Sequence, residues 1–306
     1  MSIETDLLMD RRRLKRRLFV WQVTAVLALL AAIGTAAGVW GIGGRQHIAR
    51  INVTGIISDN RKLNQAIDAL AKDTRVPAAI LFINSPGGSV SGGEGLHDVL
   101  ARLAAKKPLV AVMGGTAASA GYMIAMPAAR IFARESTLTG SIGVLLETGE
   151  ISGLLGKLGI ETEAITSGPL KDQPSFTKPL SPEGRQVLNG LVMDMYEQFV
   201  AMVAAGRHLP PERVRALADG RAYTGRQALP LGLIDQFGGE PEARDWLARE
   251  KGVAADLPVE DVETGSLSQR TFGAVLGPMV GVFQKTLLEQ GLTLDGLWAL
   301  WHPSGN

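Results

Sequence analysis

One stretch of the sequence, LVAVMGGTAASAGYMIAMP at residues 109–127, restricts the possible folds more than any other. Residues 109–113 form an apolar run that is long enough for one buried strand and too short for a helix. Gly114 and Gly115 interrupt this run, and small and apolar residues then continue at helical density up to Pro127. The pattern predicts a strand, a tight turn and a helix, which is the repeating connection of α/β proteins.

Ser119 falls at the predicted start of that helix. Its hydroxyl is expected beside free backbone N–H groups and the positive end of the helix dipole, so a nucleophile here has an anion site next to it. A serine at this position is also a common helix cap, and small residues suit close packing of a helix on a sheet. This stretch alone leaves both interpretations open.

The flanking segments alternate between strand and helix patterns. Further strands are predicted at 48–53, 78–83, 130–133, 142–146 and 161–166, and helices at 63–72, 93–105 and 152–158. This alternation predicts an α/β domain with a largely parallel sheet flanked by helices. At 181–207, apolar residues recur at helical spacing, which predicts a long amphipathic helix used for packing and assembly.

Composition excludes several classes of chemistry. The chain has no cysteine, which excludes disulfides, zinc–thiolate sites and cysteine catalysis. Its four histidines are isolated in the sequence, so we expect neither a histidine-rich metal centre nor a cofactor. Beyond residue 40 the chain holds 25 basic and 27 acidic residues, and this near-neutral balance lacks the basic patch typical of nucleic-acid binding.

The N-terminus predicts a membrane anchor. Six basic residues between Arg11 and Arg17 precede an almost uninterrupted apolar run at 18–40. Its length matches the roughly 20 residues that cross a bilayer, and the positive-inside rule keeps the basic flank in the cytoplasm. The alternative is a secretory signal peptide cleaved among the small residues at 31–37. The predicted organisation is a basic segment at 1–17, a transmembrane helix at 18–40, a linker at 41–47, a catalytic domain at 48–252 and an apolar tail at 253–306.

Two other segments are candidates for chemistry. The sequence NSPGGS at 84–89 directly follows an apolar strand, and its paired glycines allow a sharp turn with free backbone amides, as in an oxyanion hole. An ordinary strand-to-helix loop would explain the same pattern. The sequence SGPLKD at 167–172 contains a loop lysine, Lys171, which taken alone is most simply a solvated charge.

Considered together, these segments resemble the signal peptide peptidase A family of serine proteases, in its short, single-domain form. Members are membrane-anchored enzymes of the ClpP/crotonase fold that use a Ser/Lys dyad. The resemblance covers roughly residues 48–250 and rests on five motifs in order: NSPGG at 84–88, AASAGYMIA at 117–125, TGSIGV at 139–144, SGPLKD at 167–172 and DGRAYTGRQALPLGLID at 219–235. The family more often has a glycine where Ala120 stands here.

The resemblance implies a role for each matching residue. It assigns the nucleophile to Ser119, the general base to Lys171, the residue that orients the lysine amine to Ser141, the oxyanion-hole N–H groups to Gly88 and Ala120, and a substrate contact to Gly87. No histidine lies between Ser119 and His208, so a lysine has to act as the base. A neutral lysine amine requires its pKa to fall from about 10.4 to about 7–8, which burial would achieve. We therefore expect the carboxylate of Asp172 to face away from Lys171.

The resemblance also implies a biological role. The expected function is the degradation of cleaved signal peptides and similar apolar peptides at the inner membrane, with the catalytic domain on the periplasmic side. The expected assembly is a ring or dome-shaped homo-oligomer whose active sites combine residues of neighbouring subunits. A crotonase-type acyl-CoA enzyme and a catalytically inactive scaffold of the same fold are the alternatives.

Overall fold

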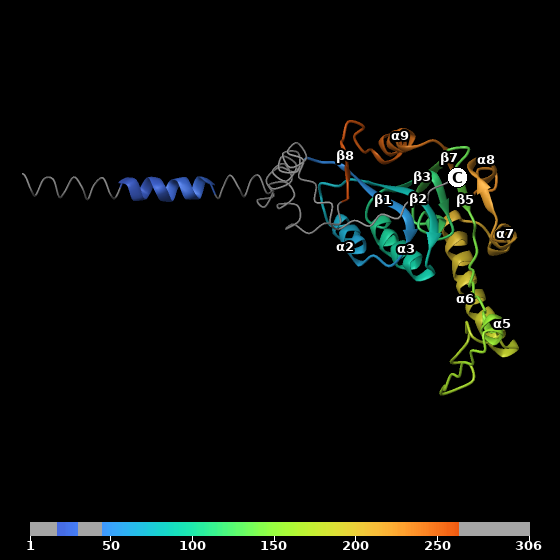
Figure 1. Ribbon diagram of the computed structural model, residues 1–306. Coiled ribbons are helices and arrows are strands. Elements are labelled where there is room, and N and C mark those ends of the chain that lie inside the picture. The colour runs from blue at the N-terminus through green and yellow to red at the C-terminus, as the bar shows by residue number, and fades with distance from the viewer. Residues whose placement is uncertain (1–16, 30–44, 263–306) are drawn as a thin grey trace, which may run out of the picture. The chain divides into compact units, whose positions relative to one another are not determined.

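The computed structural model describes residues 17–29 and 45–262 (Figure 1). Residues 17–29 form a helix with exposed side chains, and they belong to a different compact unit from the body that follows residue 45. Among the residues described, none of the helices combines the length and the apolar character needed to cross a bilayer. Residues 30–40 of the predicted transmembrane segment, residues 1–16 of the basic segment and residues 263–306 of the tail lie outside the described ranges.

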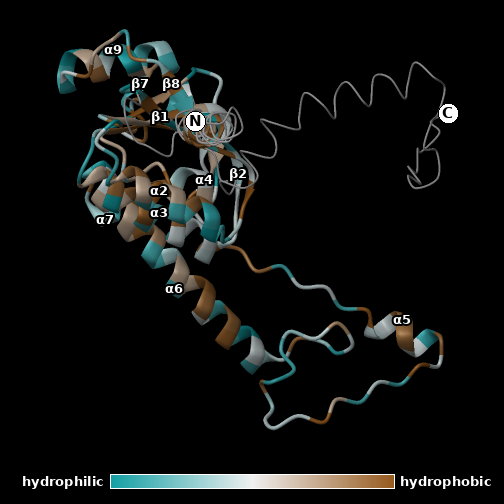
Figure 2. Ribbon diagram, turned by 90° about the vertical axis from the view of Figure 1, so that its left-hand side faces the viewer, coloured by the Kyte–Doolittle hydropathy of each residue, from teal (hydrophilic) through white to brown (hydrophobic). Residues whose placement is uncertain are grey.

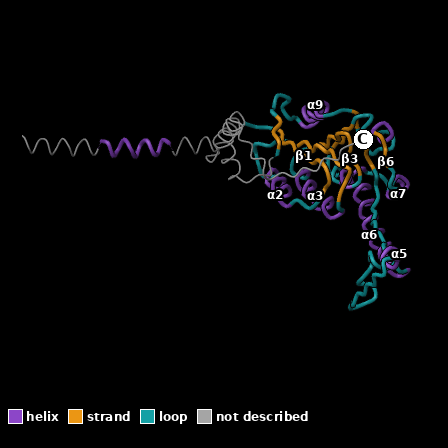
Figure 3. The backbone as a smooth tube through the Cα atoms, in the orientation of Figure 1, coloured by secondary structure: helices purple, strands orange, loops and turns teal. Residues whose placement is uncertain are grey.

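The body is built on one largely parallel sheet (Figure 3). The strand order is β6-β5-β3-β2-β1-β8, with β4 between β3 and β7, and only the β5–β6 pair is antiparallel. The strands are β1 (Ile48–Ile57), β2 (Ala79–Gly88), β3 (Leu109–Ala118), β4 (Arg130–Ala133), β5 (Leu138–Gly140), β6 (Ala222–Thr224), β7 (Gln236–Phe237) and β8 (Val259–Asp261). The predicted α/β class with a largely parallel sheet is confirmed. The sheet also includes β8, which falls within the predicted tail at 253–306.

Helices cover both faces of the sheet (Figure 1). On one face, α2 (Arg61–Leu70), α3 (Val90–Ala104), α4 (Ala120–Met123) and the end of α6 (Pro182–Arg207) contribute to a single apolar core. On the other face, α9 (Glu240–Lys251) buries a smaller core that includes Phe132 and Leu247. The remaining helices are α5 (Ser152–Lys157), α7 (Pro211–Leu217) and α8 (Gly225–Ala228).

The strand β3 is longer than predicted. Gly114 and Gly115 do not end it, because the pairing with β2 shifts at this point and resumes with Ser85 opposite Ala117. The glycines form the irregular part of the ladder, as glycines often do at bulges. The second halves of β2 and β3 therefore continue together to the candidate residues.

Two predicted strands are wrong. Residues 142–146 have no regular structure, and the nearby strand is the short β5, which pairs with β3 and β6. Ile142 is buried while Leu145 is 82% exposed, so this apolar run does not have a strand partner to cover it. Residues 161–166 also lack regular structure, and Ile165 is 95% exposed.

Only the C-terminal half of the long helix α6 is buried. Near its C-terminal end, Phe199 and Val203 lie in the core. Nearer its start, Val187 and Leu191 are about half exposed. Figure 2 shows this half of α6 projecting away from the sheet, with the loops between α5 and α6 extending beyond its far end. The predicted helix at 181–207 is confirmed, and its packing role within one chain is limited to its second half.

A partly buried ion pair fixes the end of α6. The guanidinium of Arg207 donates to both carboxylate oxygens of Asp235, at 2.6 and 3.0 Å, and to the carbonyl of Gly232 at 2.8 Å. Asp235 in turn accepts from the backbone N–H of Ile131 in β4 at 2.8 Å. The projecting helix is therefore tied to the sheet through its last turn.

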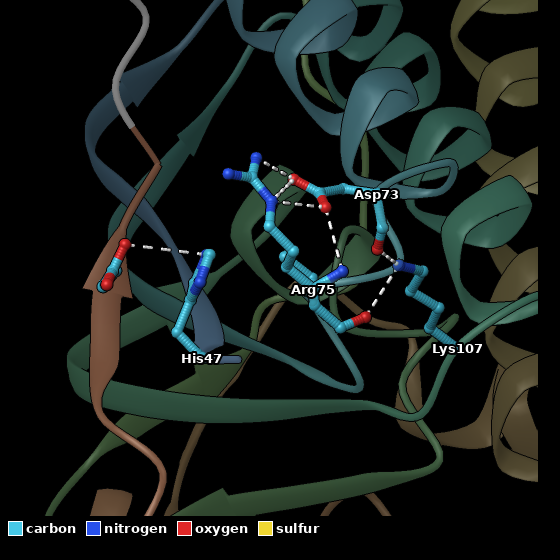
Figure 4. Close-up of polar contacts among 6 residues, drawn as sticks. His47, Asp73, Arg75 and Lys107 are labelled. Carbon is cyan, nitrogen blue, oxygen red and sulfur yellow. Dashed lines mark hydrogen bonds and ion pairs between the residues drawn. The ribbon is translucent and has the colours of Figure 1, made fainter. Parts of the chain in front are cut away.

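A cluster of charged residues lies at the N-terminal ends of the parallel strands, where β1 begins (Figure 4). Lys107 donates to the carbonyl oxygen of Asp73, and the Arg75 side chain pairs with the Asp73 carboxylate at 2.6 Å. The hydrogen bond from Arg75 lowers the pKa of Asp73 to about 2. His47 lies 3.7 Å from Glu260 at the start of β8. None of these residues is a candidate for the chemistry, and the cluster is structural.

Candidate active site

Ser119 lies at the junction of β3 and α4 in an unusual backbone conformation. Its φ of 55° and ψ of −124° belong to a region that residues other than glycine rarely occupy, at a cost of about 1–3 kcal/mol. Neighbouring hydrogen bonds enforce it, including the one from the Ser119 N–H to the Gly140 carbonyl at 2.8 Å. The Ser119 side chain makes no capping bond to α4. The hydroxyl is therefore not used as a helix cap.

Gly87 and Gly88 pass close to Ser119 and to β1. Gly87 has a φ of 117°, and a Cβ placed on it would lie 2.8 Å from the Ser119 Cβ. A Cβ on Gly88 would lie 1.8 Å from the Ile57 carbonyl oxygen. No side chain fits at either position. The backbone of NSPGG can approach Ser119 because both residues are glycines.

Ser141 is held beside Ser119 by the last sequence motif. It follows β5, with a φ of 49°, and its N–H donates to the Arg221 carbonyl at 3.0 Å. Its hydroxyl donates to the Gly220 carbonyl at 3.2 Å. The β5–β6 pair next to it rests on Tyr223, whose hydroxyl donates to the Leu217 carbonyl at 2.9 Å and whose pKa is raised by burial. The residues at 219–235 thus close the domain beside the site.

One cavity brings these residues together. It has a volume of about 400 Å³ and is lined by Gly88, Val90, Ser119, Ser141, Gly143, Val144, Leu145 and Gly220. None of these lining residues is ionisable, so within the described chain the cavity holds two hydroxyls and apolar or backbone groups. Ala120 is buried next to it as the first residue of α4.

Lys171 does not line this cavity. It is exposed in the loop between α5 and α6, where its N–H donates to the Gly168 carbonyl at 3.1 Å. The neighbouring carboxylate of Asp172 lies 3.5 Å from the Lys178 amine. The side chain of Gln173 accepts from the N–H of Ser181, the residue that caps α6. The lysine loop is therefore attached to the projecting end of α6.

Sequence reasoning missed several residues of the cavity wall. Val90, Gly143, Val144, Leu145 and Gly220 were not expected to line a site. Three of them belong to, or directly follow, the TGSIGV motif, and Gly220 belongs to the last motif. These residues could therefore have been predicted from their position in or next to the motifs. Ser85, which is completely buried beneath the glycines, was also missed.

A larger hollow of about 870 Å³ lies over the sheet face that α9 partly covers. Most of its charged side chains form ion pairs or hydrogen bonds within the chain. Arg50 pairs with Glu240 and Asp261, and Glu242 accepts a hydrogen bond from the Gly239 N–H at the start of α9. None of the candidate residues lines it. We therefore place the candidate active site in the smaller cavity.

Known proteins of similar sequence show which family the chain belongs to. A sequence model of peptidase family S49 matches residues 101–254, and a Clp protease model matches residues 51–142. A Synechocystis sp. protein named as a protease is 44% identical over 213 residues, which are 69% of this chain and 77% of the relative. An Enterococcus faecium protein named as a signal peptide peptidase SppA is 36% identical, over 70% of this chain and 67% of the relative. Protease 4 of Salmonella typhi is 41% identical, over 54% of this chain and 27% of its own length.

A ClpP-like sheet with a free serine hydroxyl at a strand–helix junction is the arrangement of a serine peptidase. The chain belongs to peptidase family S49. The resemblance drawn from the five motifs is confirmed, and the family favours peptide hydrolysis over the acyl-CoA chemistry that was the alternative.

Proposed function

We propose that this chain is a membrane-anchored serine endopeptidase that uses a Ser119/Lys171 dyad. One observation carries the proposal: Ser119 has an uncapped hydroxyl in a strained turn, and this hydroxyl shares a cavity with Ser141 and Gly88. Residues of four of the five motifs meet in the lining of this cavity.

In the proposed reaction, the Ser119 Oγ attacks the carbonyl carbon of the scissile peptide bond, and its proton passes to the neutral amine of Lys171. The N–H groups of Gly88 and Ala120 hold the oxyanion, each worth about 3–4 kcal/mol. The lysine then gives the proton to the leaving amine, and water hydrolyses the ester on Ser119. Ser141 orients the lysine amine, while Gly87 lets the backbone approach the substrate.

The lysine is proposed to come from a neighbouring subunit of a ring or dome-shaped homo-oligomer. Two observations support this. The cavity lining has no ionisable side chain, and Lys171 sits on a loop attached to the projecting end of α6. The apolar residues exposed along that half of α6 offer surface that a second copy can bury. An uncharged cavity would also desolvate the arriving amine and lower its pKa, as a general base requires.

The proposed substrates are cleaved signal peptides and similar apolar peptides. Val90, Val144 and Leu145 give the cavity an apolar wall, which suits small or apolar side chains. A relative named as a signal peptide peptidase supports the same class.

Labelling with a fluorophosphonate tests the proposed activity. This reagent forms a bond to an activated serine, so we expect one label per active site, on Ser119. The Ser119→Ala variant should not be labelled, while Ser152→Ala, which removes a partly exposed serine outside the cavity, should label like wild type. A folded wild-type oligomer that takes no label would instead indicate the inactive scaffold.

The proposed location is the inner membrane, with the body after residue 45 on the periplasmic side. The basic residues at 11–17 and the apolar run at 18–40 support it. A reporter that works only in the periplasm should be active when fused after Asn306. Replacing the six basic residues with neutral ones should reduce or invert this orientation. An inactive fusion at normal expression would contradict the topology.

A further inference from the structure

We propose that Ser85 is a positioning residue that fixes the oxyanion-binding backbone at Gly87 and Gly88. The proposal rests on the proposed function, because it concerns how the same site stabilises charge. Ser85 is 0% exposed and does not line the cavity, so it cannot touch the substrate. Any effect on the reaction must pass through its neighbours.

The Ser85 hydroxyl makes two hydrogen bonds, and both are to Gly87. It accepts from the Gly87 N–H at 3.1 Å and donates to the Gly87 carbonyl at 3.3 Å. Pro86, which lies between them, has no N–H to compete. Such local bonds from a serine to the residue two positions on fix the direction of the backbone. The hydroxyl therefore holds both polar groups of Gly87 in one orientation.

The orientation of Gly87 determines where the backbone of Gly88 lies relative to Ser119. The Cα of Gly87 faces the Ser119 side chain so closely that an added Cβ would be 2.8 Å away, and the next residue, Gly88, lines the cavity. Ser85 also contacts the helix on the other side of the site, because a Cβ added to Gly121 would lie 3.0 Å from the Ser85 carbonyl oxygen. Ser85 thus lies between the two backbone segments that carry the proposed oxyanion donors, Gly88 and Ala120.

Removing the hydroxyl should weaken transition-state binding more than substrate binding. In Ser85→Ala, the Gly87 N–H and carbonyl lose their partner, and the Gly88 N–H is no longer fixed against Ser119. Oxyanion donors act on charge that develops in the transition state, so a displaced donor lowers kcat and leaves KM nearly unchanged. A displacement near 1 Å can cost about 100-fold in rate, and we expect kcat to fall by about 10- to 100-fold.

The experiment uses the full-length oligomer and a matched control, Thr137→Val. Thr137 is also buried and also donates to a backbone carbonyl, that of Gly114 at 2.7 Å, but it does not line the cavity. The Thr137 hydroxyl also accepts from the Arg134 N–H at 3.1 Å, so each variant loses one buried hydroxyl that both donates and accepts a hydrogen bond. The measurements are kcat and KM on a peptide, Ki for a peptide boronate, which forms a tetrahedral adduct with the serine, and the thermal midpoint. We expect Ser85→Ala to lose boronate affinity by the same factor as kcat, and Thr137→Val to keep both within about twofold of wild type.

Ser85→Cys is the second variant, because its thiol keeps a weaker donor and acceptor. If Ser85→Ala fails to fold, Ser85→Cys should still lower kcat and boronate affinity together, with KM nearly unchanged. A folded Ser85→Ala enzyme with wild-type kcat and boronate affinity would overturn the inference, as would equal losses in Thr137→Val. Wild-type protein that neither cleaves the peptide nor binds the boronate would overturn the proposed function itself, so the two failures are distinguishable.

Discussion

Ser119→Ala and Lys171→Ala are each expected to lower peptide hydrolysis by on the order of 10⁴-fold or more while the oligomer stays folded. Each substitution removes a group that the proposed attack of Ser119 on the substrate requires, so the double variant should be no worse than either single one. Steady-state kinetics on a fluorogenic apolar peptide, together with the thermal midpoint, measures both properties.

The Lys171→Arg variant distinguishes two roles for Lys171, a general base that accepts a proton and a group that only supplies positive charge. Arginine stays protonated in proteins, so this variant should be as inactive as Lys171→Ala. His97→Ala is the control: His97 lies on α3 against Asp98, and it does not line the cavity. Substantial activity in Lys171→Arg would rule out Lys171 as the base, and a large loss in His97→Ala would point to a histidine mechanism.

Mixing the two inactive variants should restore activity from nearly nothing. Subunits with Ser119→Ala still carry Lys171, and subunits with Lys171→Ala still carry Ser119. In a composite site, interfaces that join the two intact residues are active, so randomly mixed rings should regain about a quarter of the wild-type rate if each interface acts independently. The proteins are co-expressed with different tags, isolated through both, and tested on the same peptide.

The control for this experiment is the double variant Ser119→Ala/Lys171→Ala mixed with wild type. It should form mixed rings in which activity falls with the share of doubly mutated subunits. If mixed rings of the two single variants form and stay inactive, the shared site is wrong and Lys171 acts within its own subunit.

The order of strands and helices up to β4 was predicted from the sequence because those signals are local. Residues 109–113 were predicted as a strand and Ser119 as a helix start, and the structure has β3 and α4 there. The length of β3 was underestimated because glycine pairs usually end strands, whereas here the partner strand shifts its register to accommodate them. That compensation depends on β2, which a local pattern cannot reveal.

The site was harder to predict than the fold. Ser119, Ser141 and Gly88 meet in one cavity, as their motifs implied. The surroundings of Lys171 depend on contacts of its loop with the start of α6, and no local pattern encodes them. The run at 142–146 was interpreted as a strand because it is apolar, but Val144 and Leu145 instead line the cavity. Apolar character alone does not distinguish a residue that a sheet covers from one that faces a ligand.

Because α6 is attached at its C-terminal end, where Arg207 pairs with Asp235, a small change in its direction there displaces its free end by a larger distance. The 26 residues of α6 span about 39 Å at 1.5 Å per residue, and the core and the ion pair together hold only its second half. The projecting half is about 20 Å long, and a bend of about 10° at its base would move the far end by about 3 Å, as much as a whole hydrogen-bond length. The loop with Lys171 is attached at that far end. In the proposed composite site, a loosely docked neighbour would therefore leave the amine of Lys171 out of reach of Ser119, and the accuracy of assembly would set the catalytic rate.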